Sequence, residues 1–182
     1  MKNIAIFGSG KGSNAKNIIN YFRLNKQIII KLIVTNRSDS GIIEIAKKNK
    51  INTLVISKSK TEGQILSELK KENISFIVLA GYLKKIPELI INNYQKKIIN
   101  IHPSLLPKYK GLNTHERVIK NNEKFSGCTV HYVTDKLDSG EIILQKKVKI
   151  FKSDTPKILS RRILVEENKL YPKAISKILT KF

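Results

Sequence analysis

The sequence has no tryptophan and a single cysteine, Cys128, among its 182 residues. One cysteine cannot form an intrachain disulfide, so a fold held together by disulfides is excluded. Five prolines and nine glycines are too few for a collagen-like chain. No apolar run approaches the roughly 20 residues of a membrane span. The apolar run after Met1 ends at Gly8, too early for a secretory signal. We therefore expect a cytoplasmic protein with no membrane partner.

Acidic residues are also scarce: 14 Asp and Glu stand against 35 Lys and Arg, a formal net charge of +21. Such a charge attracts nucleic acid without specificity. However, the lysines are scattered in pairs along the whole chain. Compositional drift of the gene towards Lys, Ile and Asn codons produces the same pattern. With 41% hydrophobic residues, the chain is long enough for one domain with its own core. We expect a single domain over residues 1–182, with nucleic-acid binding the less favoured interpretation of its charge.

Short apolar runs alternate with helical patterns through the first hundred residues. The predicted strands cover residues 4–7, 28–35, 53–55, 76–79 and 98–101, and the predicted helices begin at Asn14 or cover 41–50 and 62–73. This alternation is typical of βαβ units. Residues 128–133 and 142–150 form an antiparallel extension, and a last helix begins near Thr155 and is expected to kink or restart at Pro172. The predicted fold is an α/β doubly wound, mostly parallel sheet with helices on both faces, an antiparallel C-terminal extension and a closing C-terminal helix.

A glycine-rich loop, Gly8-Ser9-Gly10-Lys11-Gly12-Ser13-Asn14, follows the first predicted strand. In a doubly wound fold this position binds anions through backbone N–H groups and the helix dipole. The loop lacks the GK[ST] ending of an ATP-binding loop, and no acid follows the second strand as dinucleotide binding requires. Two interpretations stay open. The loop binds a small phosphate monoester at Gly12, Ser13 and Asn14, or it is a tight turn with Asn14 as helix cap.

The three histidines, His102, His115 and His131, lie within 30 residues of one another. Asn100 and His102 stand two apart on a predicted strand, so their side chains point to the same side. Asp138 lies in a turn after the His131 strand and could reach His102. A nearby carboxylate favours the protonated imidazole. A protonated histidine beside an Asn amide is suited to stabilising a developing oxyanion.

Other roles for these residues are less favoured. The gaps between the histidines match no compact zinc-ligand spacing, so we expect no metal. Cys128 lies in mid-strand and is more typical of a core residue than of a nucleophile. His131 is expected to be a hydrogen-bonded structural histidine, and His115 a surface or loop residue.

Several segments together resemble one family. They are 100–107 (NIHPSLLP), 108–112 (KYKGL), 127–131 (GCTVH), 134–140 (TDKLDSG), 79–82 (LAGY) and the loop 12–14. The chain resembles the folate-dependent formyltransferases from residue 3 to about residue 180. The 100–107 segment is specific to formyl transfer in that family, and the phosphate loop narrows the acceptor to a ribonucleotide.

The resemblance implies transfer of the formyl group of 10-formyltetrahydrofolate to the amine of glycinamide ribonucleotide, in purine biosynthesis. The N-terminal half would bind the phosphate and the C-terminal half would carry catalysis. The implied catalytic residues are Asn100, His102 and Asp138. The implied ribonucleotide contacts are Gly12, Ser13, Asn14 and Glu167. The implied folate contacts are Lys58, Leu83, Lys84, Lys85, Ile86 and Asn100, with Lys60 as an alternative to Lys58. In the acid-glycine-glycine turn of the family, Ser139 replaces a glycine.

Three other functions stay open: formylation of charged initiator tRNA, hydrolysis of formyltetrahydrofolate, and a basic nucleic-acid-binding module. The first two require a further domain for which 182 residues leave no room. We expect small-molecule substrates only, and a monomer or homodimer. Because Pro103 and Pro107 bracket a tight apolar turn, we also expect a cis peptide bond at Leu106-Pro107.

Overall fold

The computed structural model describes residues 1–57 and 59–180 and divides into two compact units, Met1–Ile99 and Asn100–Phe182. The first unit alternates strands and helices as predicted. Its strands are Lys2–Phe7 (β1), Ile28–Thr35 (β2), Asn52–Val55 (β3) and Phe76–Leu79 (β4). Its helices are Ser13–Phe22 (α1), Ile42–Lys48 (α2), Glu62–Lys71 (α3) and Glu88–Asn93 (α4). Helix α4 is not among the elements predicted from the sequence.

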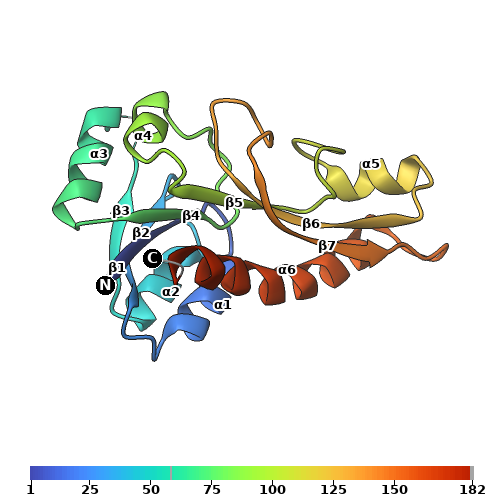
Figure 1. Ribbon diagram of the computed structural model, residues 1–182, viewed down its shortest axis with the longest axis horizontal. Helices are drawn as coiled ribbons and strands as arrows, with labels where there is room; N and C mark the ends of the chain where they lie inside the picture. The colour runs from blue at the N-terminus through green and yellow to red at the C-terminus, as the bar shows by residue number, and fades with distance from the viewer. Residues whose placement is uncertain (58, 181–182) are drawn as a thin grey trace. The chain divides into compact units, whose positions relative to one another are not determined.

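All strand pairs of this unit are parallel: β1 pairs with β2 and β4, and β2 pairs with β3. Helices α1 and α2 lie on one face of these strands, and α3 and α4 lie on the other (Figure 1). Ile4, Ile6 and Ile77 are completely buried as a result. Cover on both faces explains why these strands are apolar along their whole length rather than at alternate residues.

Local sequence sets the start and the buried face of α3. Thr61 and Gln64 form a reciprocal capping box at its start. Its buried residues Ile65, Leu66 and Leu69 share one face. The capping box satisfies two backbone donors that the first turn of a helix leaves without partners. This helix therefore follows from sequence signals that lie within ten residues of one another.

The second unit contains the antiparallel extension and the long C-terminal helix. Its elements are Thr114–Lys120 (α5), Phe125–Tyr132 (β6), Ile142–Lys149 (β7) and Pro156–Leu179 (α6). Strands β6 and β7 pair antiparallel, and α6 packs against both. The Thr155 side chain caps α6 by accepting a hydrogen bond from the Ile158 N–H at 3.3 Å. The predicted extension, cap and closing helix are confirmed.

The predicted restart at Pro172 is wrong, because α6 continues through this proline to Leu179. A proline inside a helix costs roughly 3 kcal/mol, since it removes one backbone hydrogen bond. The residues around it offset this cost by burial: Tyr171, Ala174 and Ile175 are completely buried. Packing of the apolar face therefore outweighs the local preference of Pro172.

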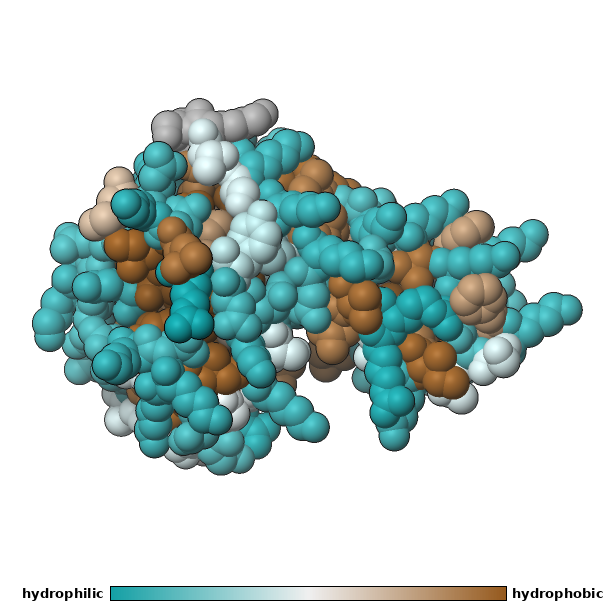
Figure 2. Space-filling view, turned by 90° about the horizontal axis from the view of Figure 1, so that it is seen from below, coloured by the Kyte–Doolittle hydropathy of each residue, from teal (hydrophilic) through white to brown (hydrophobic). Residues whose placement is uncertain are grey.

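The strand Ile98–His102 (β5) contains the boundary between the two units. The seven strands belong to one mostly parallel sheet in the order β3-β2-β1-β4-β5-β6-β7. The predicted fold class is confirmed, while one domain over residues 1–182 stays a prediction. Hydrophilic side chains dominate the face in Figure 2, and hydrophobic residues form separate patches there. Among the described residues, no helix has the length and apolarity to cross a membrane.

Candidate active site

The glycine-rich loop after β1 is braced by buried serine hydroxyls. Ser9 is 1% exposed, and its Oγ accepts a hydrogen bond from the Leu83 N–H at 2.9 Å. The same hydroxyl donates to Asn36 Oδ1. Ser40 Oγ donates to the Gly10 carbonyl at 2.8 Å. These bonds hold the loop in one conformation and tie it to the segment after β4.

Gly12 makes the turn from this loop into α1. Its φ is +77°, and a Cβ atom here would lie 2.7 Å from Cδ1 of Ile45. Helix α1 begins at Ser13, so the prediction of Asn14 as its cap is wrong. No side chain among the described residues caps this helix. Its first backbone N–H groups, beside the exposed Ser13, can therefore bind an anion.

The segment 83–86, expected to contact folate, follows β4. Leu83, Lys84 and Lys85 are exposed, whereas Ile86 is 3% exposed. A pocket of about 170 Å³ adjoins it and is lined by Phe7, Ile56, Ser57, Lys60, Glu62, Ile65, Tyr82, Lys84, Lys85, Pro87 and Ile90. Three lysines and one glutamate thus line this small pocket together with apolar side chains. Lys58 lies outside the described residues, but its alternative Lys60 is part of this lining.

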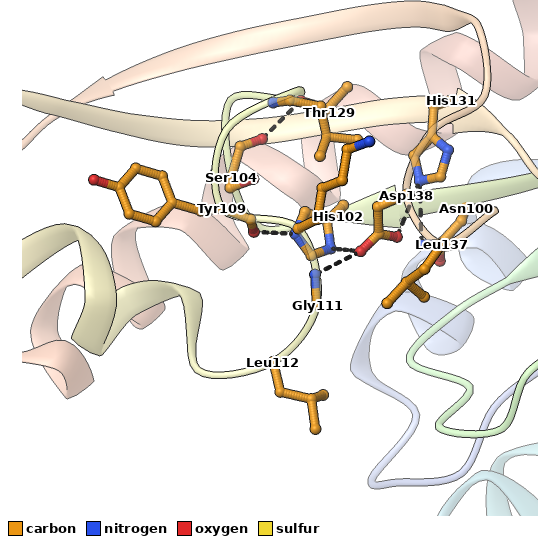
Figure 3. A network of polar contacts seen from close by, with 12 residues as sticks. Asn100, His102, Ser104, Tyr109, Gly111, Leu112, Thr129, His131, Leu137 and Asp138 are labelled. Atoms are coloured by element: carbon orange, nitrogen blue, oxygen red, sulfur yellow. Dashed lines mark hydrogen bonds and ion pairs between the residues drawn. The ribbon is translucent and has the colours of Figure 1, made fainter.

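In the second unit, a polar network connects Asn100, His102 and Asp138 (Figure 3). Asp138 Oδ2 lies 3.3 Å from Nδ1 of His102. Its other oxygen lies 3.6 Å from Nε2 of His131, and that nitrogen lies 3.3 Å from the Asn100 amide nitrogen. His102 and Asp138 are 5% and 9% exposed, and Asn100 is half-buried. The three residues expected to act together are therefore members of one network.

His102 faces a hydrogen-bond acceptor at each ring nitrogen. Nε2 lies 2.8 Å from the Tyr109 carbonyl oxygen, while Nδ1 faces the Asp138 carboxylate. A carbonyl oxygen can only accept, so Nε2 carries a hydrogen. The Asp138 carboxylate beside Nδ1 is an ion-pair partner for this imidazole whenever the ring is protonated.

His131 holds a definite tautomer and orients the Asn100 amide. Its Nδ1 lies 2.8 Å from the Tyr132 carbonyl oxygen and must carry a hydrogen there. Burial lowers the pKa of His131, outweighing the opposing effects of the Tyr132 carbonyl and Asp138, and the charge of His102 adds to the lowering. In the neutral ring Nε2 is then an acceptor for an Asn100 N–H. His131 is a hydrogen-bonded buried histidine, as expected, and it leaves the second Asn100 N–H to a ligand.

Main-chain groups complete this network. The Gly111 N–H donates to Asp138 Oδ2 at 2.9 Å. Tyr109 and Asp138 have φ values of +58° and +46°. Asp138 lies in the expected turn and is buried there, where the Gly111 N–H and His102 contact its carboxylate. Neither the Tyr109 carbonyl nor the Gly111 N–H could be found from sequence, since every residue except proline carries both groups.

The turn after β5 is held by a hydroxyl and an amide from the antiparallel pair. Thr129 Oγ1 donates to the Ser104 carbonyl at 2.6 Å and accepts from the Leu106 N–H at 3.1 Å. Gln145 Nε2 donates to the Leu106 carbonyl at 3.0 Å and to Thr129 Oγ1 at 2.8 Å. The Leu106-Pro107 bond is cis, as predicted. Thr129 and Gln145, not singled out from sequence, therefore support the turn that leads to Tyr109.

The other candidate residues have simpler environments. His115 is half-buried in the first turn of α5, so its assignment to the surface or a loop is wrong; burial and the charge of His102 lower its pKa. Cys128 is completely buried; burial, with the charges of Glu167 and Glu166, raises its thiol pKa to about 12. A thiol with this pKa is a core residue and not an active nucleophile. Glu167 is 7% exposed on α6. The described residues include no group of three or more side chains arranged to hold a metal ion.

Comparison with known proteins identifies the family. The formyl transferase family model matches residues 2–175. The chain belongs to this family. It is 34% identical to phosphoribosylglycinamide formyltransferase of Escherichia coli over 96% of its own length and 85% of that relative. It is 36% identical to the chloroplastic phosphoribosylglycinamide formyltransferase of Arabidopsis thaliana, covering 97% of this chain and 65% of the plant protein.

Solved structures agree with the sequence relatives. The crystal structure of phosphoribosylglycinamide formyltransferase from Anaplasma phagocytophilum matches with a TM-score of 0.94 and 35% identity, over 98% of this chain and 87% of that chain. The enzyme of the same name from Bacillus halodurans matches with a TM-score of 0.93 and 36% identity, over 99% and 96%. This formyl transferase therefore shares its fold with these proteins over nearly its whole length.

Proposed function

We propose that this formyl transferase moves the formyl group of 10-formyltetrahydrofolate to the primary amine of glycinamide ribonucleotide. The products are formylglycinamide ribonucleotide and tetrahydrofolate, in purine biosynthesis. One observation carries the proposal: His102 is held between the Asp138 carboxylate and the Tyr109 carbonyl, in the same network as Asn100. The names of the relatives support the choice of acceptor.

The chemistry needs no covalent enzyme intermediate. The acceptor nitrogen attacks the formyl carbon, and negative charge develops on the formyl oxygen. The free Asn100 N–H and the His102 cation stabilise that oxyanion, because both present hydrogen-bond donors or positive charge in a water-poor site. As the carbon–nitrogen bond to folate breaks, His102 gives a proton to the departing nitrogen. For this transfer, the His102 Nε2–H breaks its hydrogen bond to the Tyr109 carbonyl and donates to the substrate instead. The proton that the acceptor nitrogen loses on becoming an amide returns to His102, so the net reaction consumes none.

Asp138 acts through His102. Its carboxylate keeps the imidazole charged and oriented, and the Gly111 N–H keeps the carboxylate in place. The proposed catalytic residues are therefore Asn100 and His102, with Asp138 as the residue that positions and charges His102.

The two substrates carry anionic groups that suit the first unit. The ribonucleotide phosphate would bind the N–H groups of Gly12, Ser13 and Asn14. Glu167, in the second unit, stays a predicted ribonucleotide contact. The pocket beside Leu83–Ile86 has three lysines against one glutamate, among apolar residues, and this excess of positive charge suits a folate with its glutamate tail. Leu83, Lys84, Lys85, Ile86 and Lys60 are the proposed folate contacts here. Cytoplasmic location and a monomeric or homodimeric state stay predictions.

The test is formyl transfer from 10-formyltetrahydrofolate to three acceptors: glycinamide ribonucleotide, charged initiator tRNA and water. We expect rapid product formation only with glycinamide ribonucleotide, and its loss in His102→Asn. Equal or faster transfer to charged tRNA would overturn the proposed acceptor. Release of formate without any acceptor would instead identify a hydrolase.

A further inference from the structure

A second pocket in the Asn100–Phe182 unit lies outside the residues described so far as substrate contacts. It measures about 620 Å³, within the range of roughly 300–1,000 Å³ usual for small-molecule sites. Leu105, Pro107 and Val118 contribute apolar lining, and Tyr109 and Phe125 contribute aromatic rings. We call it the β6 pocket, because Phe125 begins β6. Its apolar and aromatic lining suits the ring of an organic ligand.

The rim of the β6 pocket is strongly basic. Lys108, Lys124 and Lys147 line it together with one carboxylate, Glu123. Lys108 pairs with Glu123 at 3.1 Å. Among the described residues, no carboxylate lies within ion-pair distance of Lys124 or Lys147; the Lys147 ammonium instead lies 3.7 Å from the centroid of the Phe125 ring. Three ammonium groups and one carboxylate leave a formal charge of +2, which complements a phosphate dianion.

The β6 pocket is connected to the catalytic network through one residue. The Tyr109 carbonyl accepts a hydrogen bond from His102, while the Tyr109 ring points away from His102 (Figure 3). The ring hydroxyl donates to Glu123 at 2.9 Å and accepts from Asn121 at 3.0 Å. A ligand in the β6 pocket would therefore contact the ring of Tyr109, whose carbonyl accepts the hydrogen bond from His102 Nε2. It would hold that carbonyl in place and oppose the exchange that proton transfer requires.

We propose that the β6 pocket is a regulatory site for a nucleoside phosphate, whose base packs on the apolar and aromatic lining and whose phosphate pairs with the rim lysines. Its occupation slows formyl transfer by keeping Tyr109 against His102. The size of the pocket, its charge and its two rings select this occupant over an uncharged nucleoside or inorganic phosphate.

Adenosine 5′-monophosphate is the probe. Calorimetry uses the whole chain carrying Ser13→Ala, which weakens the loop proposed for the substrate phosphate. We expect one site to remain in this background, and Lys124→Glu with Lys147→Glu to weaken it at least tenfold. The matched control, Lys26→Glu with Lys71→Glu, makes the same change in net charge at exposed residues elsewhere and should leave affinity unchanged. Equal losses in both double variants would overturn the proposal, as would loss of all binding in Ser13→Ala alone.

Two further measurements define the ligand and its effect. Phe125→Leu should weaken the nucleotide at least threefold, and adenosine or inorganic phosphate alone should bind at least tenfold more weakly than the nucleotide. Inorganic phosphate binding as tightly would overturn the nucleoside assignment.

In the otherwise wild-type enzyme, the nucleotide should lower kcat at saturating substrate, and the Lys124/Lys147 variant should lose this inhibition with its basal kcat retained. Inhibition overcome by glycinamide ribonucleotide would place the nucleotide in the substrate site. Activity without the nucleotide reports on the formyl transfer proposal separately.

Discussion

At the scale of single residues, the candidate site depends on how buried charges find partners. Asp138 is 9% exposed; it accepts a hydrogen bond from the Gly111 N–H and faces Nδ1 of His102 at 3.3 Å. A buried carboxylate without such donors would cost several kcal/mol. The same donors orient it towards His102. Stability and catalysis are therefore coupled at this side chain.

We expect Asp138→Asn to lower kcat by about 10²–10³-fold, the usual effect of losing one electrostatic contribution to an oxyanion site. The amide keeps the shape and tolerates the positive φ, but it cannot hold the His102 cation. His102→Asn should lose more, because it removes the cation itself. The double variant should lose little more than His102→Asn alone. Steady-state kinetics of the three variants measure this.

Asp135→Asn is the matched control, since Asp135 is exposed in the same loop. It should leave kcat unchanged. Multiplicative losses for Asp138→Asn and His102→Asn would show that Asp138 acts independently of His102, for example by ordering the loop.

The pH dependence of stability follows from His115 and His131. Their pKa values are lowered in the folded protein, chiefly by burial. The unfolded chain protonates near the ordinary value of about 6.5, so it binds more protons than the folded chain as the pH falls below that value. The free energy of unfolding should therefore decrease on acidification from pH 7 towards the lower folded-state values. Urea unfolding across this range should show a shallower slope in His131→Gln and His115→Gln. Wild-type slopes in both would contradict the prediction.

At the scale of elements, close backbone approach sets which residues the site can tolerate. Gly127 of β6 pairs with Lys147 of β7. A Cβ atom at Gly127 would overlap the Lys146 carbonyl and lie 2.6 Å from Cδ2 of Leu105 in the turn. The adjacent Thr129 and Gln145 brace that turn. The strand pair and the catalytic turn therefore depend on one another.

Gly127→Ala should lower the free energy of unfolding by about 1–3 kcal/mol, the usual cost of overpacking a close contact. Thermal unfolding measures it. Gly63→Ala is the control: the nearest atom to its Cβ is Thr61 Oγ1 at 4.0 Å, and alanine is favoured within α3. A Gly127→Ala protein as stable as Gly63→Ala would mean that β6 and β7 separate at no cost.

The start of α1 supplies a second element-scale prediction. Ser13→Ala with Asn14→Ala should raise KM for glycinamide ribonucleotide several-fold and leave KM for the folate nearly unchanged, because the first turn of α1 is the proposed phosphate site. Kinetics with each substrate varied in turn distinguish the two effects. A raised folate KM with an unchanged ribonucleotide KM would assign the loop to the other ligand.

At the scale of the whole molecule, the charge of +21 acts on encounter rather than on fold. Both proposed substrates are anionic. Their association with the enzyme should therefore slow as salt shortens the screening length from about 30 Å at 0.01 M to about 8 Å at 0.15 M.

We expect kcat/KM for glycinamide ribonucleotide to fall several-fold between about 0.01 M and 0.15 M salt, while kcat changes little. The reason is that screening acts on approach and much less on groups buried with their partners. A kcat/KM that is independent of salt would mean that the lysines serve the solvated surface alone.

Local and periodic signals were enough to predict much of this protein. The apolar runs predicted β1, β2 and β4. Thr155 predicted the start of α6, and their spacing placed Asn100 and His102 on the same side of one strand. Each of these signals acts between residues close in the chain. The turn after the His131 strand predicted Asp138, and two nearby prolines predicted the cis bond at Leu106-Pro107.

Contacts between distant residues decided the rest. Only the tertiary structure places the Tyr109 carbonyl on His102, sets the tautomer of His131 and joins Thr129 and Gln145 to the turn. It also carries α6 past Pro172 and starts α1 at Ser13. Main-chain carbonyls and N–H groups are the same at almost every residue, so no sequence pattern marks the ones that a fold will use. Burial then determines which side chains are charged, because desolvation depends on everything packed around a group.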